Sequence, residues 1–135
     1  MSVFADSISS AALEKALSAN WQKVQLISNN IANEDTPGYK ARRMEFESYL
    51  RRELQNQSSN MRVTAMTKRQ KISRISTLRP YVYQDKSTVG RADGNNVNLD
   101  SEQMELARVQ IQYQALRDRI NSHYQTLKYA ISGGR

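Results

Sequence analysis

The sequence contains no cysteine among its 135 residues. This absence excludes a disulfide framework and any metal site built on thiolates. Apolar residues are also scarce, because they make up 39% of the chain and the mean hydropathy is −0.74. No apolar run approaches the roughly 20 residues that a helix needs to span a bilayer. We therefore expect one domain at most, with little apolar surface for a dense core of its own.

Signals for secretion and for catalysis are absent as well. The stretch MSVFADSISSAALEK has no basic region followed by an apolar one, so we expect no cleaved signal peptide. There is no phosphate-binding loop, dinucleotide-binding turn or nucleophile elbow. The only histidine, His123, stands at a core-type helix position, which favours a packing role. Glu45 and Glu47 lie among basic residues and are expected to form solvated ion pairs. We expect no enzyme activity, no cofactor and no metal.

The positive charge is concentrated in the middle of the chain. The net charge is +7, and residues 40–91 carry thirteen basic residues against four acidic ones. Residues 1–39 carry two lysines against four acids, and residues 92–135 carry five basic residues against five acids. Such a block indicates an interaction surface or a solvated linker. The stretch KRQKISR at residues 68–74 lacks interleaved aromatic residues, so nucleic-acid binding is the weaker interpretation.

The N-terminal region has the pattern of an amphipathic helix. Apolar residues recur every three or four positions, which predicts a helix from about residue 8 to residue 33. Pro37 and Gly38 then end it. The stretch from Thr36 to Tyr39 suits a type II turn, because proline fixes φ at its second position and glycine accepts a positive φ at its third. The residues expected to face a partner helix are Leu13, Leu17, Trp21, Val24 and Ile31.

The C-terminal region carries a stronger pattern. Apolar residues alternate at steps of three and four over three and a half heptads, which favours a coiled-coil seam. We expect Asp100 and Gln103 to form a capping box at the start of this helix, and Gly133 and Gly134 to end it. The seam residues are Leu106, Val109, Tyr113, Leu116, Ile120 and Leu127. A second apolar stripe on the same helix requires a further neighbour and consists of Met104, Ala107, Ile111 and Ala115.

Between these helices the patterns are weaker. A short helix is expected through Phe46, Tyr49 and Leu50, and the stretch from Ile72 to Tyr83 is expected to form one or two short strands. The sequence NQSSN at residues 56–60 is expected to break the structure. We expect a helix-and-turn segment at 1–39, an irregular basic segment at 40–93 and a coiled-coil helix at 94–135. The two ends are expected to pair into one helical domain, so the predicted fold class is mainly α.

Motifs at the two ends of the chain resemble those of bacterial flagellar rod, hook and related axial proteins. The first motif is NNIANEDTPGYKAR, residues 29–42. The second begins with DGNNVNLD at residue 93 and continues through the long terminal helix, and it is similar to the Gly-Asn-x-Val-x-Leu-Asp pattern of the family. Within the family the resemblance is to a short proximal rod subunit. The resemblance assigns an assembly motif consisting of Asn29, Asn30, Asn33, Thr36, Pro37, Gly38 and Tyr39.

The resemblance implies a structural subunit of the flagellar basal-body rod. Such a subunit polymerises through its terminal helices into part of the drive shaft for motility, without a cofactor and without inserting into a membrane. It would reach the periplasmic rod through the flagellar type III export pathway without a cleaved signal peptide. The implied partners are copies of itself, FlgC and the distal rod proteins, the adaptor FliE, the MS ring and the export gate. The asparagines would hydrogen-bond across packed helix ends, and the turn would direct the chain outward.

The residues alone are also compatible with two other classes of protein. A soluble coiled-coil adaptor or secretion chaperone would purify as a discrete helical oligomer, whereas a rod subunit would purify as a poorly ordered monomer. A basic nucleic-acid-binding protein would retain DNA in a salt-sensitive manner. The physical behaviour of the purified chain therefore separates these classes.

At micromolar concentration the isolated chain is expected to be a largely disordered or loosely helical monomer. Its apolar content is low and both helical stripes stay partly uncovered, so too little surface is buried to offset the entropy of ordering the chain. Gel filtration combined with circular dichroism on dilute protein measures this. A cooperative thermal transition in a dilute monomer would contradict the prediction.

Overall fold

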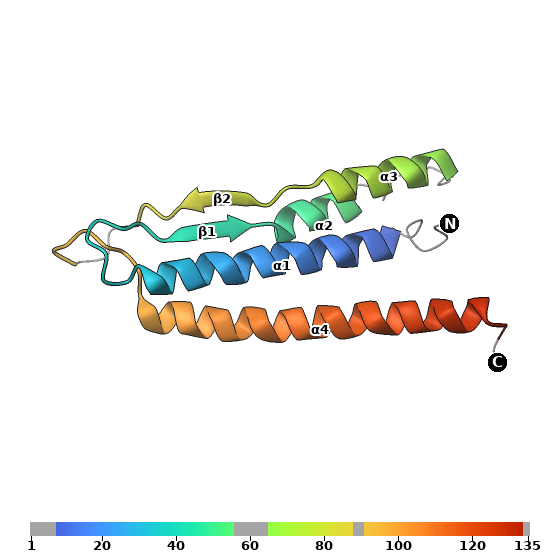
Figure 1. Cartoon of the computed structure of the whole chain (residues 1–135). Coiled ribbons are helices and arrows are strands. Elements are labelled where there is room, and N and C mark those ends of the chain that lie inside the picture. Colours follow the sequence, from blue (N-terminus) through green and yellow to red (C-terminus); the bar gives the residue numbers. More distant parts are fainter. Residues whose placement is uncertain (1–7, 56–64, 88–90, 134–135) are drawn as a thin grey trace.

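The computed structural model of the chain describes residues 8–55, 65–87 and 91–133 (Figure 1). As the sequence predicted, the fold is mainly α, with long helices at both ends and a small sheet in the middle. None of the described helices has an apolar stretch long enough to cross a membrane. In chain order the elements are α1 (Ile8–Ala32), β1 (Arg42–Glu45), α2 (Glu47–Gln55), α3 (Ala65–Thr77), β2 (Tyr81–Gln84) and α4 (Leu99–Ile131).

Helix α1 is the central element of an elongated molecule. It runs antiparallel to α4, which lies along one side of it, while β1, α2 and α3 lie along the other side (Figure 1). A helix with neighbours on two sides must bury more than one stripe. Ala11, Ala19 and Ile27 are accordingly buried on α1, although none of them belongs to the set expected to face the partner helix.

The contact between α1 and α4 follows the predicted heptad pattern along α4. Val109 is fully buried, and the half-buried residues of this seam are Leu106, Tyr113, Leu116, Ile120 and Leu127. On α1 the half-buried residues of the expected set are Leu13, Leu17, Val24 and Ile31. Trp21 was expected inside the contact but is 53% exposed. Its ring centroid lies 6.1 Å from that of Tyr113, at the rim of the seam, because α1 turns its most buried side partly toward β1 and α3.

Two polar links join α1 and α4 outside the apolar seam. Lys23 Nζ lies 2.8 Å from Glu105 Oε1, and the Tyr124 hydroxyl donates a 2.7 Å hydrogen bond to Glu14 Oε1. Hydrogen bonds from Arg108, and secondarily the contact with Lys23, lower the pKa of Glu105 to about 2. Glu105 is therefore charged at neutral pH, and this pair helps to fix the axial position of α4 against α1.

The ends of α4 differ in part from the prediction. Asp100 was expected to cap the helix, but Asn98 does so, with its Oδ1 accepting a 3.0 Å hydrogen bond from the Ser101 backbone nitrogen. The prediction was wrong because Leu99 already lies inside the helix, which places Asp100 in the first turn, where a carboxylate still complements the helix dipole. At the other end α4 stops at Ile131, and Gly133 has the positive φ of 66° typical of a helix stop.

The middle of the chain is more regular than the sequence indicated. The predicted short helix is present as α2, but residues 72–77 belong to helix α3, so the prediction of a strand there was wrong. Lys71 and Ile75 are buried at a helical spacing of four, and Lys71 Nζ donates a 3.0 Å hydrogen bond to the Leu54 carbonyl of α2. This packing against α2 and α1 makes α3 a helix. The expected break at residues 56–60 lies outside the described residues.

The predicted strand is confined to β2, which pairs antiparallel with β1. The register places Arg42 opposite Gln84 and Glu45 opposite Tyr81. Every residue of β2 is exposed, and the rings of Tyr81 and Tyr83 stack with their centroids 5.8 Å apart. This two-stranded ribbon therefore depends on contacts at its base for its position, because a lone hairpin is only marginally stable in water.

Replacing Val109 with Asp is expected to reduce the pairing of α1 and α4 strongly. An unpaired carboxylate at this fully buried position costs on the order of several kcal/mol. The readout is far-UV circular dichroism during titration with trimethylamine oxide, which favours burial. The variant should need more osmolyte to reach the wild-type helical signal. The matched control is Gln110→Asp, at the exposed neighbouring position; equal behaviour of the two variants would show that the seam does not stabilise the helix pair.

Candidate assembly site

The loop after α1 is held by two close-packed turns. The Tyr39 nitrogen donates to the Thr36 carbonyl (3.2 Å) and Gly38 has φ of 73°, which confirms the predicted type II turn. The Gly38 nitrogen also donates a 2.8 Å hydrogen bond to the Asp93 carbonyl. A Cβ atom on Gly94 would lie 3.8 Å from the Gly38 Cα. The segment before α4 is thus laid directly against the turn after α1.

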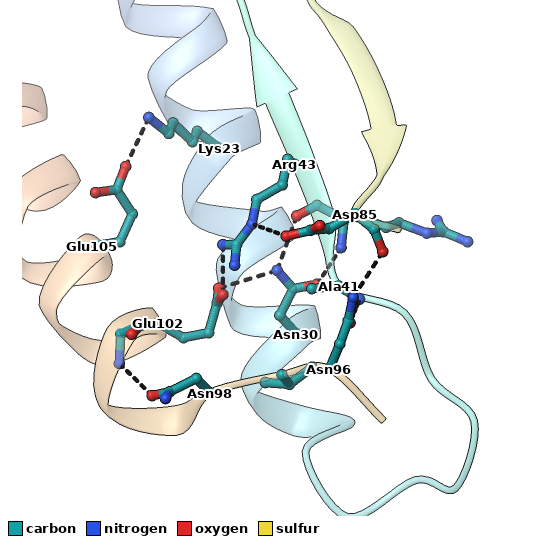
Figure 2. Close-up of polar contacts among 12 residues, drawn as sticks. Lys23, Asn30, Ala41, Arg43, Asp85, Asn96, Asn98, Glu102 and Glu105 are labelled. Atoms are coloured by element: carbon teal, nitrogen blue, oxygen red, sulfur yellow. Dashed lines mark hydrogen bonds and ion pairs between the residues drawn. The ribbon is translucent and has the colours of Figure 1, made fainter. Parts of the chain in front are cut away.

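Asn30 joins three elements through one buried side chain (Figure 2). Its Nδ2 donates to the Arg42 carbonyl (2.9 Å) and to Glu102 Oε2 (3.1 Å). Its Oδ1 accepts from the Arg42 nitrogen (2.9 Å) and from the Tyr39 hydroxyl (3.2 Å). The amide therefore pairs with the backbone of β1 as a neighbouring strand would, while it also holds the first turn of α4.

Glu102 supplies a buried negative charge to the same cluster. Its side chain has no exposed surface, and the Arg43 guanidinium lies 2.5 Å from its Oε1 as an ion pair without a well-aligned hydrogen bond. Arg43 also lies 3.6 Å from Asp85, whose pKa is lowered chiefly by a hydrogen bond from the Ser87 backbone. A buried carboxylate is tolerated only when it is paired and hydrogen-bonded, so α4 can dock here only with Asn30 and Arg43 in place.

Asn96 completes the base of the β1–β2 hairpin. Its Oδ1 accepts from the Ala41 nitrogen (2.7 Å) and its Nδ2 donates to the Asp85 carbonyl (2.7 Å), as Figure 2 shows. The Asp85 nitrogen meanwhile donates to the Ala41 carbonyl (2.8 Å). The side-chain amide therefore stands between two backbone groups that would otherwise pair directly, and it ties the hairpin to the segment that leads into α4.

Asn95 satisfies backbone carbonyls of the loop that follows α1. Its buried side chain donates from Nδ2 to the carbonyls of Asn33 (2.9 Å), Glu34 (2.8 Å) and Thr36 (2.9 Å). Its Oδ1 accepts from the Val97 nitrogen (2.7 Å). These three residues follow Ala32, the last residue of α1, so Asn95 holds the loop after the helix from a distant part of the chain. We call Asn30, Arg43, Asn95, Asn96 and Glu102 the asparagine network.

The structure divides the residues of the expected assembly motif. Asn30 belongs to the asparagine network, and Tyr39 donates a hydrogen bond to it, whereas Asn29 is exposed and the Asn33 side chain bonds only to Asn29 and Thr36. Pro37 and Gly38 are exposed and shape the turn. Sequence reasoning thus assigned equal weight to three asparagines, of which one is buried.

Four members of the network were missed from the sequence. Asn95 and Asn96 were identified only as part of the second motif, Arg43 only as part of the basic segment, and Glu102 was given no role. One signal was present, because Glu102 lies four residues before Leu106 and so continues the heptad seam. A carboxylate at a seam position indicates a buried partner of opposite charge. Within the described residues no group of three side chains is arranged to hold a metal ion.

An apolar stripe on α4 lies open on the surface. Met104 and Ile111 are 69% and 68% exposed, and Ala107 and Ala115 beside them are exposed too. These residues lie on the side of α4 away from the seam with α1, so no described part of the chain covers them. The molecule therefore presents much surface that a neighbour can cover.

Comparisons with known proteins agree with the motifs at both ends. A family model described as flagella basal body rod protein matches residues 12–40, which span most of α1 and the turn. The flagellar basal body rod protein FlgB of Bacillus subtilis is 38% identical over 136 residues, covering 100% of both chains. FlgB of Escherichia coli is 34% identical over 108 residues (75% of this chain, 76% of the relative). FlgB of Borreliella burgdorferi is 32% identical over 104 residues (73% and 76%).

Replacing Asn30 with Asp is expected to open the base of the hairpin. The change removes two donated hydrogen bonds and places a second carboxylate about 3 Å from Glu102, at a cost on the order of 3 kcal/mol. Amide hydrogen exchange at Ala41 and Arg42, measured in stabilising osmolyte, should then become at least about tenfold faster. Asn33→Asp is the control from the same motif and should change exchange little. Similar exchange in both variants would argue against the network.

Proposed function

The chain belongs to the FlgB family of flagellar basal body rod proteins and is a structural subunit of that rod, and we propose that it polymerises through the exposed stripe of α4. The observation that carries this proposal is the exposed apolar row of Met104, Ala107, Ile111 and Ala115 on a helix whose other side is already packed against α1. A stripe of this kind is a typical surface for packing against another helix.

The thin fold suits a part that becomes stable in an assembly. Few residues are fully buried in the described core, and the two long helices share one seam. Burial of the stripe by a neighbour adds apolar contact at ~25 cal/mol per Å² of apolar surface. Assembly then supplies stability that the single chain lacks, and incorporation stabilises the folded form by mass action.

Family membership supports a more detailed proposal for the partners and the export route of the chain. We propose that the partners are further copies of this chain, FlgC and the distal rod proteins, the adaptor FliE, the MS ring and the export gate. We propose that the chain reaches the periplasmic part of the basal body through flagellar type III export, without a cleaved signal peptide. The assembly-motif residues act in this proposal by fixing the loop from which the hairpin departs. No catalytic role is proposed for any residue.

The basic middle of the chain is better explained by protein contacts than by nucleic acid. Several of its cations already pair with acids of the same chain: Arg43 with Glu102, Arg74 with Glu53 at 3.7 Å, and Arg91 with Glu34 at 2.8 Å. These pairs connect different elements of the fold. The remaining exposed cations are available to acidic surfaces of neighbouring subunits.

Replacing Ile111 with Asp is expected to abolish rod assembly while the subunit is still made and folds as before. The side chain is 68% exposed in the single subunit, so a charge there is tolerated until a neighbour must cover it. The test is soft-agar swimming of a flagellated strain in which the variant replaces its own FlgB, together with electron microscopy of purified basal bodies.

The matched control is Gln110→Asp, which makes the same charge change at the adjacent exposed position outside the stripe. It should swim nearly as well as wild type. Normal swimming with Ile111→Asp, while wild-type chain supports motility, would show that the stripe is not an interface. Failure of the wild-type chain itself to enter basal bodies would instead contradict the rod assignment in that strain.

A further inference from the structure

The two edges of the β1–β2 ribbon differ in what covers them. On the outer edge of β1, the Asn30 side chain bonds to both backbone groups of Arg42. These groups therefore point away from β2, which makes Arg42 and Gln84 a pair without mutual hydrogen bonds in the antiparallel ladder. Helix α1 also packs along β1. The outer edge of β1 is thus occupied within the subunit.

The outer edge of β2 has no such cover. Because hydrogen-bonded and non-hydrogen-bonded pairs alternate along the ladder, Val82 and Gln84 direct their N–H and C=O groups away from β1. No hydrogen bond from another described residue reaches these groups. Strand β2 lies on the side of β1 away from α1 (Figure 1). The two residues therefore offer two donors and two acceptors to a further strand.

The side chains of β2 add apolar surface to both faces of this edge. Tyr81 and Tyr83 are 57% and 42% exposed and stack on one face, and Val82 is 46% exposed on the other. An exposed edge with three large apolar side chains is a typical site for the addition of a strand. Because β2 has four residues and follows Pro80, the segment that pairs with it is short.

Charge at the two ends of β2 disfavours a second copy of the chain as the occupant. Arg79 before the strand and Lys86 after it are exposed, and neither forms an ion pair with a described residue. Antiparallel pairing of two β2 edges, with Val82 opposite Gln84 of the other copy, places Arg79 of each copy beside Lys86 of the other. Parallel pairing in register places each cation beside its own counterpart. Like charges at neighbouring positions of a ladder are unfavourable.

The acids near β2 do not cancel this charge at the outer edge. Asp85 lies 3.6 Å from Arg43 of β1, so its charge is directed toward the interior of the ribbon. Glu45 belongs to β1 and Glu47 to α2 directly after it, so both follow the paired edge of β2 rather than the outer one. A segment with an acid toward each end therefore complements the outer edge better than a second β2 does.

We infer that the outer edge of β2 receives a short extended segment of a different basal-body protein, with apolar residues in its middle and an acid toward each end. The segment adds a third strand to the ribbon by bonding to the backbone of Val82 and Gln84. Its apolar side chains lie beside those of β2, and its acids meet Arg79 and Lys86. The inference is separate from the α4 stripe and rests only on the presence of the chain in the rod.

Photocrosslinking in assembled basal bodies identifies the occupant. Val82 is replaced by the photoreactive amino acid p-benzoylphenylalanine in a strain lacking its own FlgB, and the variant is first shown to support swimming. Basal bodies are irradiated and purified, and the cross-linked peptides are identified by mass spectrometry. We expect a product with a different basal-body protein, at a segment that carries an acid on each side of the cross-linked residue.

The same cross-link, made in two further variants, tests the role of the backbone edge. Gln84→Pro removes an outward N–H and places a ring on the outer edge, whereas the hydrogen bonds of β2 to β1 come from Tyr81 and Tyr83. Gln84→Thr changes the same side chain and keeps the N–H. The product should be several-fold less abundant with Gln84→Pro than with Gln84→Thr. Amide exchange at Arg43, measured on the isolated variants in stabilising osmolyte, should be similar and would show that the ribbon is intact.

Charge reversal provides a reading that leaves the strand itself unchanged. Arg79→Glu combined with Lys86→Glu should reduce the product several-fold. The matched control is Lys68→Glu combined with Arg69→Glu, which makes the same charge change at exposed positions of α3 and should leave the product near the wild-type level.

Three results would overturn the inference while leaving the rod function intact. One is a product that joins position 82 to a second copy of the chain. Another is basal bodies that contain the chain but give no product. The third is equal product from both variants of either pair. Absence of the wild-type chain from basal bodies would contradict the rod function and the inference together.

Discussion

The buried carboxylate of Glu102 constrains the region where the loop after α1, the base of the β1–β2 hairpin and the start of α4 meet. We call this region the elbow. A charge without solvent contact has to be matched, and the two groups that match it come from different elements: the amide of Asn30 from α1 and the guanidinium of Arg43 from β1. Docking of α4, closure of the hairpin and the end of α1 are thereby linked. Loss of any one partner leaves the other two with uncompensated polarity, so the elbow forms as a unit.

The parts of the fold that depend on local patterns were predicted from the sequence. The heptad spacing identified the face that buries Val109, and Pro37 with Gly38 identified the turn. The parts that depend on distant partners were not. Nothing in the neighbourhood of Asn95 shows that it holds the loop after α1, because the carbonyls it binds lie about sixty residues earlier. Helix α3 was missed for a similar reason, since its apolar residues are few and pack on α1 and α2.

The hydrogen-bonded elbow and the exposed apolar surfaces of the long helices have different roles. The asparagine network is polar, and most of its hydrogen bonds are made within the subunit. The long helices are the opposite, with an open apolar row on α4 and a groove beside α1. A subunit built in this way keeps the angle of its hairpin fixed while its helices remain available to neighbours. The hydrogen-bonded network and the exposed apolar row are thus separate surfaces of the same molecule, although the row begins at Met104, two residues after Glu102.

The spacing of the elbow contacts along the chain sets the order in which the subunit can fold. The bond from Asn30 to Glu102 spans 72 residues, and that from Ala41 to Asn96 spans 55. Contacts this far apart require the closure of long loops, which slows folding. When the chain emerges with its N-terminus first, Asn30 lacks its distant partner until residue 102 has emerged as well. The contacts of the elbow therefore form only after most of the chain has emerged.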